Sequence, residues 1–371
     1  MASFESLLAD APGGPAAGVL ADAARSKRAG RVRLEALARD LFGDDAVRVD
    51  EAQRTRIRAL LTTVTRTIEG RIRRDLLVRL AGVLPAHILM VLGNMTVRVA
   101  RIALDADGPV DPDLVAVLAR RVDEHRLVTQ AHIAVTQDPL LVDAPVLDGL
   151  TRHGDAGVAG AARALVERDA ARRGRFDEPV LVPEDLPIDV CARLHWRIAA
   201  AIRHWIDRQD VMMTGAIDRA VAAATGSALS GAAAVPDHDA VAIMLARAML
   251  RTGIADDAGT VAFAVEGHVA AAVAGLALRA GIGMAAAWDM VLDPDGARLV
   301  VLLRAAAIDR SAAAALMLRW PDGAAPIDAI VDRMAGYDAL SDAAAQDAID
   351  LYRLDPDYVA ALDAGPQARG R

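Results

Sequence analysis

The fold is decided between Val97 and Leu165, where three segments read VRVARIAL (97–104), LVTQAHIA (127–134) and VAGAARAL (158–165). Each segment places small or apolar residues three and four positions apart, which is the spacing of one face of an α-helix. The segments recur about every thirty residues, a period typical of stacked helical repeats. We therefore expect paired helices that lie side by side, each pair burying its apolar face against the next.

The starts of the intervening helices repeat as well. Asp111-Pro112 is a typical helix start, because aspartate caps free backbone amides and proline tolerates the first helical position. Asp143 with Pro145 repeats this pattern, and residues 114–120 then correspond to residues 146–152. A stack of such units usually forms a surface that binds a partner, and it rarely supplies catalytic chemistry.

The composition favours helices throughout the chain. Hydrophobic residues make up 54% of the sequence but aromatic residues only 3%, so alanine, leucine and valine dominate. Small side chains let helices approach closely, whereas strands favour β-branched and aromatic residues that alternate with polar ones. We predict an all-α protein, in which a HEAT-like stack of helical repeats is followed by a C-terminal helical domain.

One segment separates the two predicted domains. Residues 168–187 carry many charges, Gly174 and the prolines Pro179, Pro183 and Pro187. Such a stretch is typical of a domain junction. We therefore predict a helical-repeat domain over residues 1–170, a linker over 171–188, a C-terminal helical domain over 189–362 and a flexible tail over 363–371.

Charge and cysteine usage restrict the function and the compartment. The formal charge of −8 argues against general nucleic-acid binding, because phosphates attract basic surfaces. Cys191 is the only cysteine, which excludes an intrachain disulfide and fits a reducing cytoplasm. Charged residues and glycines interrupt the most apolar region, residues 261–291, so it predicts buried helices and no membrane span.

Several runs of sequence carry a family resemblance. They read NMTVRVA (94–100), DEHRL (123–127), LVVLLRAA (299–306) and SAAAAL (311–316). Together they resemble the bacterial family catalogued as domain of unknown function 2336, over most of the chain. The resemblance implies helical repeats of HEAT-like character in a bacterial protein. It implies no activity and no functional residues.

A charged cluster marks the predicted start of one repeat helix. Asp123-Glu124-His125-Arg126 places acidic residues where they complement the helix dipole. Arg98 occupies a similar place one unit earlier, and Arg101 lies on the next turn. We predict that Arg98, Arg101, His125 and Arg126 form a partner-binding face. The alternative interpretation is capping with a salt bridge between repeats.

The helix that begins near Asp50 is strongly basic and has an unbroken apolar stripe. Its arginines, which outnumber its acidic residues Glu51, Glu69 and Asp75, are Arg54, Arg56, Arg58, Arg66, Arg71, Arg73, Arg74 and Arg79. A basic amphipathic helix can bind nucleic acid, an anionic membrane or an acidic protein. We predict Arg66, Arg71, Arg73 and Arg74 as contacts; a solvated face that is salt-bridged to the acidic remainder is the alternative.

Two further patterns match only part of a known functional motif. Cys191 and His195 lie four apart on one predicted helix, but a metal site would need further ligands from elsewhere. Gly281-Ile282-Gly283 matches the start of a dinucleotide fingerprint, yet a helix is predicted where the mechanism requires a strand. We predict no catalytic residue, no metal and no cofactor.

We therefore expect a non-enzymatic protein-interaction or regulatory scaffold of the cytoplasm, whose partner is another protein. A sensor of an anionic, nucleotide-like ligand is the alternative, because arginines near helix starts suit phosphates. An enzyme without a recognisable motif is the least favoured class. The apolar C-terminal half also favours a homodimer, because exposed alanine and leucine surface tends to be covered.

Overall fold

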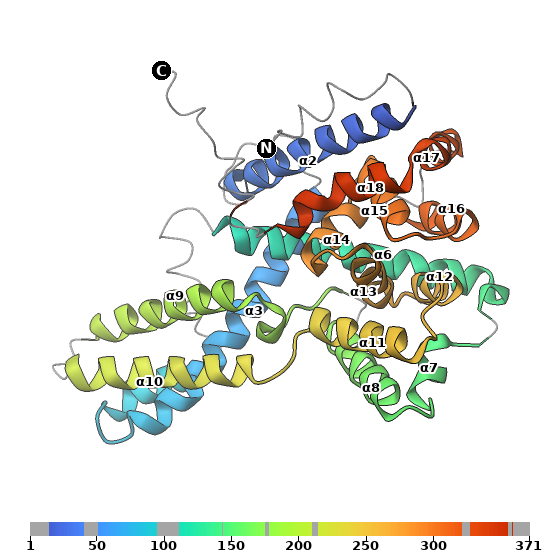
Figure 1. The fold of residues 1–371 in the computed structure, drawn as a ribbon. Helices are drawn as coiled ribbons and strands as arrows, with labels where there is room; N and C mark the ends of the chain where they lie inside the picture. Colours follow the sequence, from blue (N-terminus) through green and yellow to red (C-terminus); the bar gives the residue numbers. More distant parts are fainter. Residues whose placement is uncertain are drawn as a thin grey trace, which may run out of the picture. The chain divides into compact units, whose positions relative to one another are not determined.

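The fold is helical throughout the residues that the computed structural model describes, which are 15–40, 51–94, 111–142, 144–174, 178–209, 214–320, 327–354 and 358 (Figure 1). In these ranges the strand-like pairing is limited to an isolated bridge between Arg173 and Pro179. The predicted all-α class is confirmed.

The chain forms two compact units, and each is assembled from segments that are distant in sequence. The α3 unit consists of Arg33–Val122 and Arg168–His238, and the α13 unit of Met1–Val32, Asp123–Glu167 and Asp239–Arg371. This division is interleaved, whereas the predicted boundaries at residues 170 and 189 were sequential. Four helices contribute residues to both units, namely α2 (Pro15–Asp40), α6 (Pro112–Gln137), α8 (Ala156–Ala171) and α11 (His238–Thr252).

The α3 unit is organised around its longest helix. Its further elements are α3 (Glu51–Arg79), α4 (Ala86–Gly93), the 3₁₀ turn η2 (Pro183–Asp185), α9 (Ile188–Asp207) and α10 (Thr214–Ala233). Helix α3 packs against α4, α9, α10 and η2, and α9 lies beside α10 (Figure 1). The buried residues of α3 recur three and four apart, including Ile57, Val64 and Ile68, so the predicted apolar stripe is the core-facing side.

The α13 unit is built around helices that are buried on nearly every side. Its further elements are η1 (Pro139–Leu141), α7 (Val146–Thr151), α12 (Asp257–Glu266), α13 (Val269–Ala280), α14 (Met284–Val291), α15 (Ala297–Ala305), α16 (Arg310–Arg319), α17 (Ile327–Ala339), α18 (Asp342–Ile349) and η3 (Asp350–Arg353). Helix α13 packs against α12, α14 and α15. Every residue of α13 is buried except Gly275, Leu278 and Arg279, as expected for a helix that is apolar all round.

The turn between α13 and α14 accounts for the glycine pattern at residues 281–283. Gly281 ends α13 with a left-handed φ of 69°, which a residue with a side chain rarely adopts, and Gly283 precedes α14. A helix therefore precedes the glycines, as predicted. Among the described helices none is alone long and apolar enough to cross a membrane; α13 and α14 meet that test together, but they are bent by 113° at this turn.

The predicted repeat is not reproduced by the helices. Residues 114–120 and 127–134, which were expected to form two helices of a hairpin, lie in the single helix α6. Their counterparts, residues 146–151 and 158–165, do lie in two helices, α7 and α8. Gly154 breaks the second unit, whereas no glycine or proline stands between Asp113 and Gln137. The first segment, residues 97–104, lies outside the described residues.

Candidate partner-binding surface

The predicted partner-binding face falls on the middle of α6. Arg98 and Arg101 lie outside the described residues. Because α6 is continuous, Asp123 is an internal residue and not the predicted helix start. His125 is buried, with its Nε2 3.4 Å from Thr129 Oγ1, and the half-exposed Arg126 lies 3.9 Å from Asp123. Of the two predicted residues His125 and Arg126, only Arg126 is accessible to solvent.

The four arginines predicted on the basic helix occupy three different environments. Arg66 and Arg74 are exposed on α3. Arg71 is half-buried, and its guanidinium lies 2.6 Å from the carboxylate of Glu184 in η2. Arg73 is only 1% exposed, so it cannot contact a partner. The surface role predicted for this helix therefore rests on Arg66 and Arg74.

Arg73 of α3 forms hydrogen bonds to the C-terminal end of α4. Its Nε and Nη2 donate to the carbonyl oxygens of Leu92 (2.6 Å), Val91 (3.0 Å) and Asn94 (2.9 Å), where α4 ends. Its Nη1 donates to the buried carboxylate of Glu69 at 2.8 Å. The last carbonyls of a helix lack partners within the helix, so a guanidinium placed there satisfies and stabilises them.

Arginines and threonines form a polar strip with a positive charge on the outward side of α3. Arg56 and Arg74 are separated by five helical turns and point the same way, about 27 Å apart along the axis. Exposed Thr63 and half-exposed Thr67 lie on the line between them, and Arg66 lies beside it. Arg56 and Arg66 have no hydrogen-bond or ion-pair partner within the described part of the chain. We call these five residues the α3 strip.

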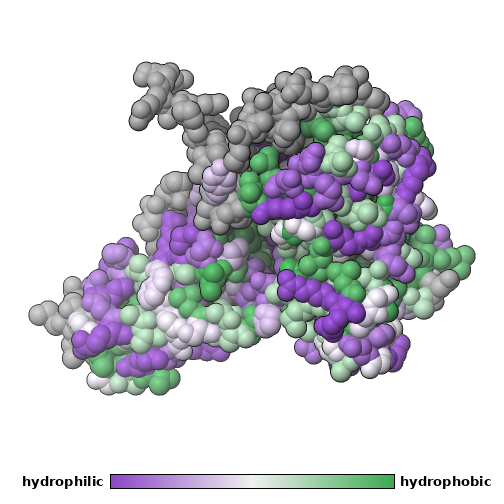
Figure 2. All heavy atoms as spheres, viewed as in Figure 1, coloured by the Kyte–Doolittle hydropathy of each residue, from purple (hydrophilic) through white to green (hydrophobic). Residues whose placement is uncertain are grey.

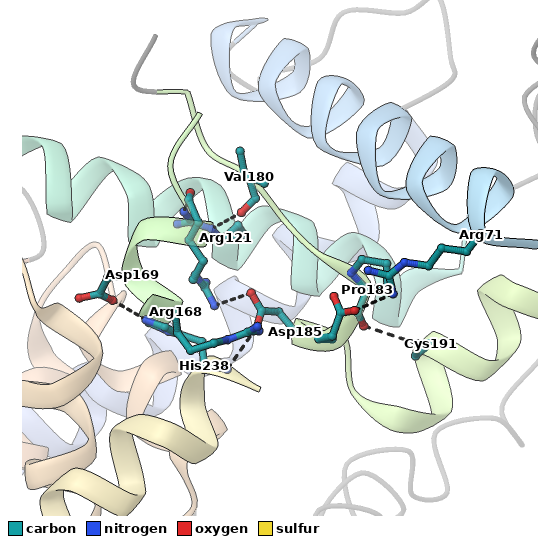
Figure 3. A network of polar contacts seen from close by, with 11 residues as sticks. Arg71, Arg121, Arg168, Asp169, Val180, Pro183, Asp185, Cys191 and His238 are labelled. Atoms are coloured by element: carbon teal, nitrogen blue, oxygen red, sulfur yellow. Dashed lines mark hydrogen bonds and ion pairs between the residues drawn. The ribbon is translucent and has the colours of Figure 1, made fainter. Parts of the chain in front are cut away.

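A second cluster of charges lies around η2, where its members pair with one another (Figure 3). Asp185, whose side chain is 1% exposed, pairs with Arg168 and with Arg172, the latter at 3.2 Å, and accepts the His238 backbone N–H. Arg121 donates to the carbonyl oxygens of Val180 and Arg172 at 3.0 and 2.6 Å. The segment predicted as a linker is thus fastened into the α3 unit by buried ion pairs.

The family of the chain follows from a match to a family model. The model described as an uncharacterised protein conserved in bacteria (DUF2336) matches residues 110–350. The chain belongs to this family. No curated protein and no solved structure matched the chain. The DUF2336 match covers α6 to α18 and leaves out α3, so the α3 strip lies outside the matched region.

Within the DUF2336 region, Cys191 and His195 of α9 form a buried contact. The His195 Nδ1–H donates to the Cys191 carbonyl oxygen at 2.7 Å, and Cys191 Sγ lies 3.5 Å from the same nitrogen. Burial raises the pKa of the Cys191 thiol to about 11, so the thiol is neutral and a poor nucleophile near neutral pH. No group of three potential metal ligands occurs among the described residues.

His195 should make stability depend on pH. Burial lowers its pKa, and the buried Nε2 has no hydrogen-bond partner that could stabilise an added proton. An unfolded histidine binds a proton below about pH 6.5, whereas folded His195 binds one only at lower pH, so acid favours unfolding. We expect the wild type to lose up to about 1.4 kcal/mol of unfolding free energy per pH unit below that pH, relative to His195→Gln.

Urea denaturation over a series of pH values would measure this difference. Exposed His204, on the same helix, supplies the matched control, because His204→Gln should keep the wild-type pH dependence. Parallel pH profiles for the wild type and His195→Gln would contradict the prediction.

Proposed function

We propose that the chain is a non-catalytic interaction protein of the bacterial cytoplasm that captures an acidic protein segment through the α3 strip. The observation that carries this proposal is that Arg56 and Arg66 are exposed and have no partner among the described residues, in a chain whose net charge is −8. In a protein with excess carboxylates, such arginines remain available to an external anion. Exposed arginines favour carboxylates, which they can bind through two parallel hydrogen bonds.

The shape of the strip favours an extended protein partner over a small ligand. A nucleotide-like ligand needs donors that converge on it from a concave site. The guanidinium groups of Arg56 and Arg74 instead project from one helix about 27 Å apart. A helix or extended segment with acidic residues can follow that distance and contact each arginine in turn.

The same strip is a poor fit for a membrane surface or for nucleic acid. A helix that binds in the membrane interface inserts its apolar face into the lipid. The apolar face of α3 is instead buried in the core of its own unit. Nucleic acids require a broadly basic surface, and the overall charge of this chain is negative.

Binding of a fluorescently labelled acidic helical peptide, followed by anisotropy, would test the proposal. The variant Arg56→Gln/Arg66→Gln should bind the peptide about tenfold more weakly, because two ion pairs of up to about 1 kcal/mol each are lost. Wild-type binding should also weaken as salt is added, since exposed charges are screened.

The control replaces two other exposed arginines of the α3 unit, Arg208 and Arg219, and so makes the same change in net charge. Arg208→Gln/Arg219→Gln should bind the peptide as the wild type does. Equal weakening in both double variants would reduce the effect to net charge and overturn the assignment to the α3 strip. Binding of duplex DNA or anionic vesicles in preference to the peptide would replace the proposed partner class.

A further inference from the structure

Helix α17 of the α13 unit carries an apolar stripe that faces solvent. Ile327 is 77% exposed and Val331 is 59% exposed, and the exposed Ala335 follows four residues later. The exposed carboxylates of Asp328 and Asp332 border this stripe and have no ion-pair partner among the described residues. Residues four apart lie on one side of a helix, so these five form a single apolar and acidic face, the α17 face.

Helix α11 carries a face of the opposite charge. Met244 and Leu250 are 51% and 42% exposed, and the exposed Arg247 and Arg251 lie between and beside them. Arg251 lies 3.6 Å from Asp155, whereas Arg247 has no partner within the described ranges. Over α11, strongly hydrophilic surface lies next to hydrophobic surface (Figure 2). We call these four residues the α11 face.

We propose that the α17 face of one copy of this chain packs against the α11 face of a second copy. Both faces combine exposed apolar side chains with charges, and the charges are of opposite sign. Asp328 and Asp332 are four residues apart, as are Arg247 and Arg251, so both pairs repeat at about 6 Å along their helices. Two packed helices can therefore form both ion pairs while burying the apolar side chains between them.

The positions of the two faces determine the kind of assembly. In Figure 1 α17 lies at the upper right of the α13 unit and α11 lies below α13, so the two faces occupy different parts of the unit. A contact between two different faces joins copies head to tail and produces a ring or a short filament. This self-association uses neither the α3 strip nor its partner, and the two proposals can fail separately.

Sedimentation velocity of the full chain at increasing concentrations would test the proposal. The wild type should form species larger than the monomer as concentration rises. Ile327→Asp should raise the dissociation constant at least about 30-fold, because the contact loses an anchoring apolar side chain and must desolvate a carboxylate instead. A wild type that stays monomeric would overturn the proposal. Ile327→Asp that assembles like the wild type would overturn it too, because association would then use another surface.

The chain offers a closely matched control. Ile188 is 76% exposed and is the first residue of α9, just as Ile327 is the first residue of α17. An aspartate is favourable in the first turn of either helix, so both variants should fold. Ile188→Asp should assemble like the wild type, and equal loss in both variants would overturn the role of α17.

Exchange of the charges tests the pairing itself. Arg247→Glu/Arg251→Glu alone and Asp328→Lys/Asp332→Lys alone should each be monomeric, because like charges then meet across the contact. A mixture of the two variants should assemble again, since every junction in it can pair opposite charges. Failure of the mixture to assemble would overturn the pairing of α17 with α11.

Discussion

Replacing Arg73 with methionine should lower the free energy of unfolding by about 3–5 kcal/mol, the usual cost of breaking a buried ion pair. The change leaves the carboxylate of Glu69, which is 4% exposed, buried without its guanidinium. It also removes the donor to three carbonyl oxygens at the end of α4. Urea denaturation followed by circular dichroism would measure the loss.

Two further variants test whether the loss comes from the buried ion pair. Arg66→Met changes an exposed arginine of the same helix and should alter stability by no more than about 0.5 kcal/mol. Arg73→Met/Glu69→Met should be more stable than Arg73→Met, because the Glu69 carboxylate is then removed together with its guanidinium partner. A loss below about 1 kcal/mol for Arg73→Met would contradict the structural role assigned to this arginine.

Asp185→Asn should be about as costly, again about 3–5 kcal/mol. The carboxylate is 1% exposed and is shared by Arg168 and Arg172, so the variant removes a negative charge that two guanidinium groups contact. The oxygen of the asparagine amide can still accept a hydrogen bond from the backbone N–H of His238. The variant therefore removes the charge of the side chain and keeps its acceptor. Urea denaturation at neutral pH would measure the effect.

The exposed pair formed by Asp148 and Arg152 is the appropriate comparison. Its side chains are 57% and 70% exposed and lie 2.7 Å apart, yet exposed pairs contribute at most about 1 kcal/mol. Asp148→Asn should therefore be nearly neutral. If Asp185→Asn and Asp148→Asn lower the free energy of unfolding by the same small amount, the buried charges do not stabilise the segment around η2.

The sequence is sufficient to predict the helices and the core of the α3 unit, because both depend on local periodicity. The stripe that includes Ile57, Val64 and Ile68 is buried as its spacing requires. The same reasoning failed at α6, where a charged cluster after Val122 resembled a helix start. Charges are tolerated inside a helix, so a charged cluster does not by itself mark a helix start.

The environment of each arginine could not be predicted from its spacing. Arg73 and Arg74 are adjacent in sequence, yet one is buried against the end of α4 and the other is exposed. Adjacent positions point about 100° apart on a helix, and which direction faces a neighbouring helix is decided by tertiary packing. Asp185 was missed for the same reason, because its partners Arg168 and Arg172 lie more than ten residues away.

The interleaved path of the chain has a consequence for synthesis. The α3 unit is complete once His238 has emerged from the ribosome, whereas Met1–Val32 belongs to a unit that also needs Asp239–Arg371. The earliest part of the chain must therefore wait for the last part before its own apolar residues, such as Ala23, are covered. A chain that ends near residue 240 should contain a folded α3 unit and an N-terminal helix whose apolar residues remain exposed. Chaperones should bind this helix.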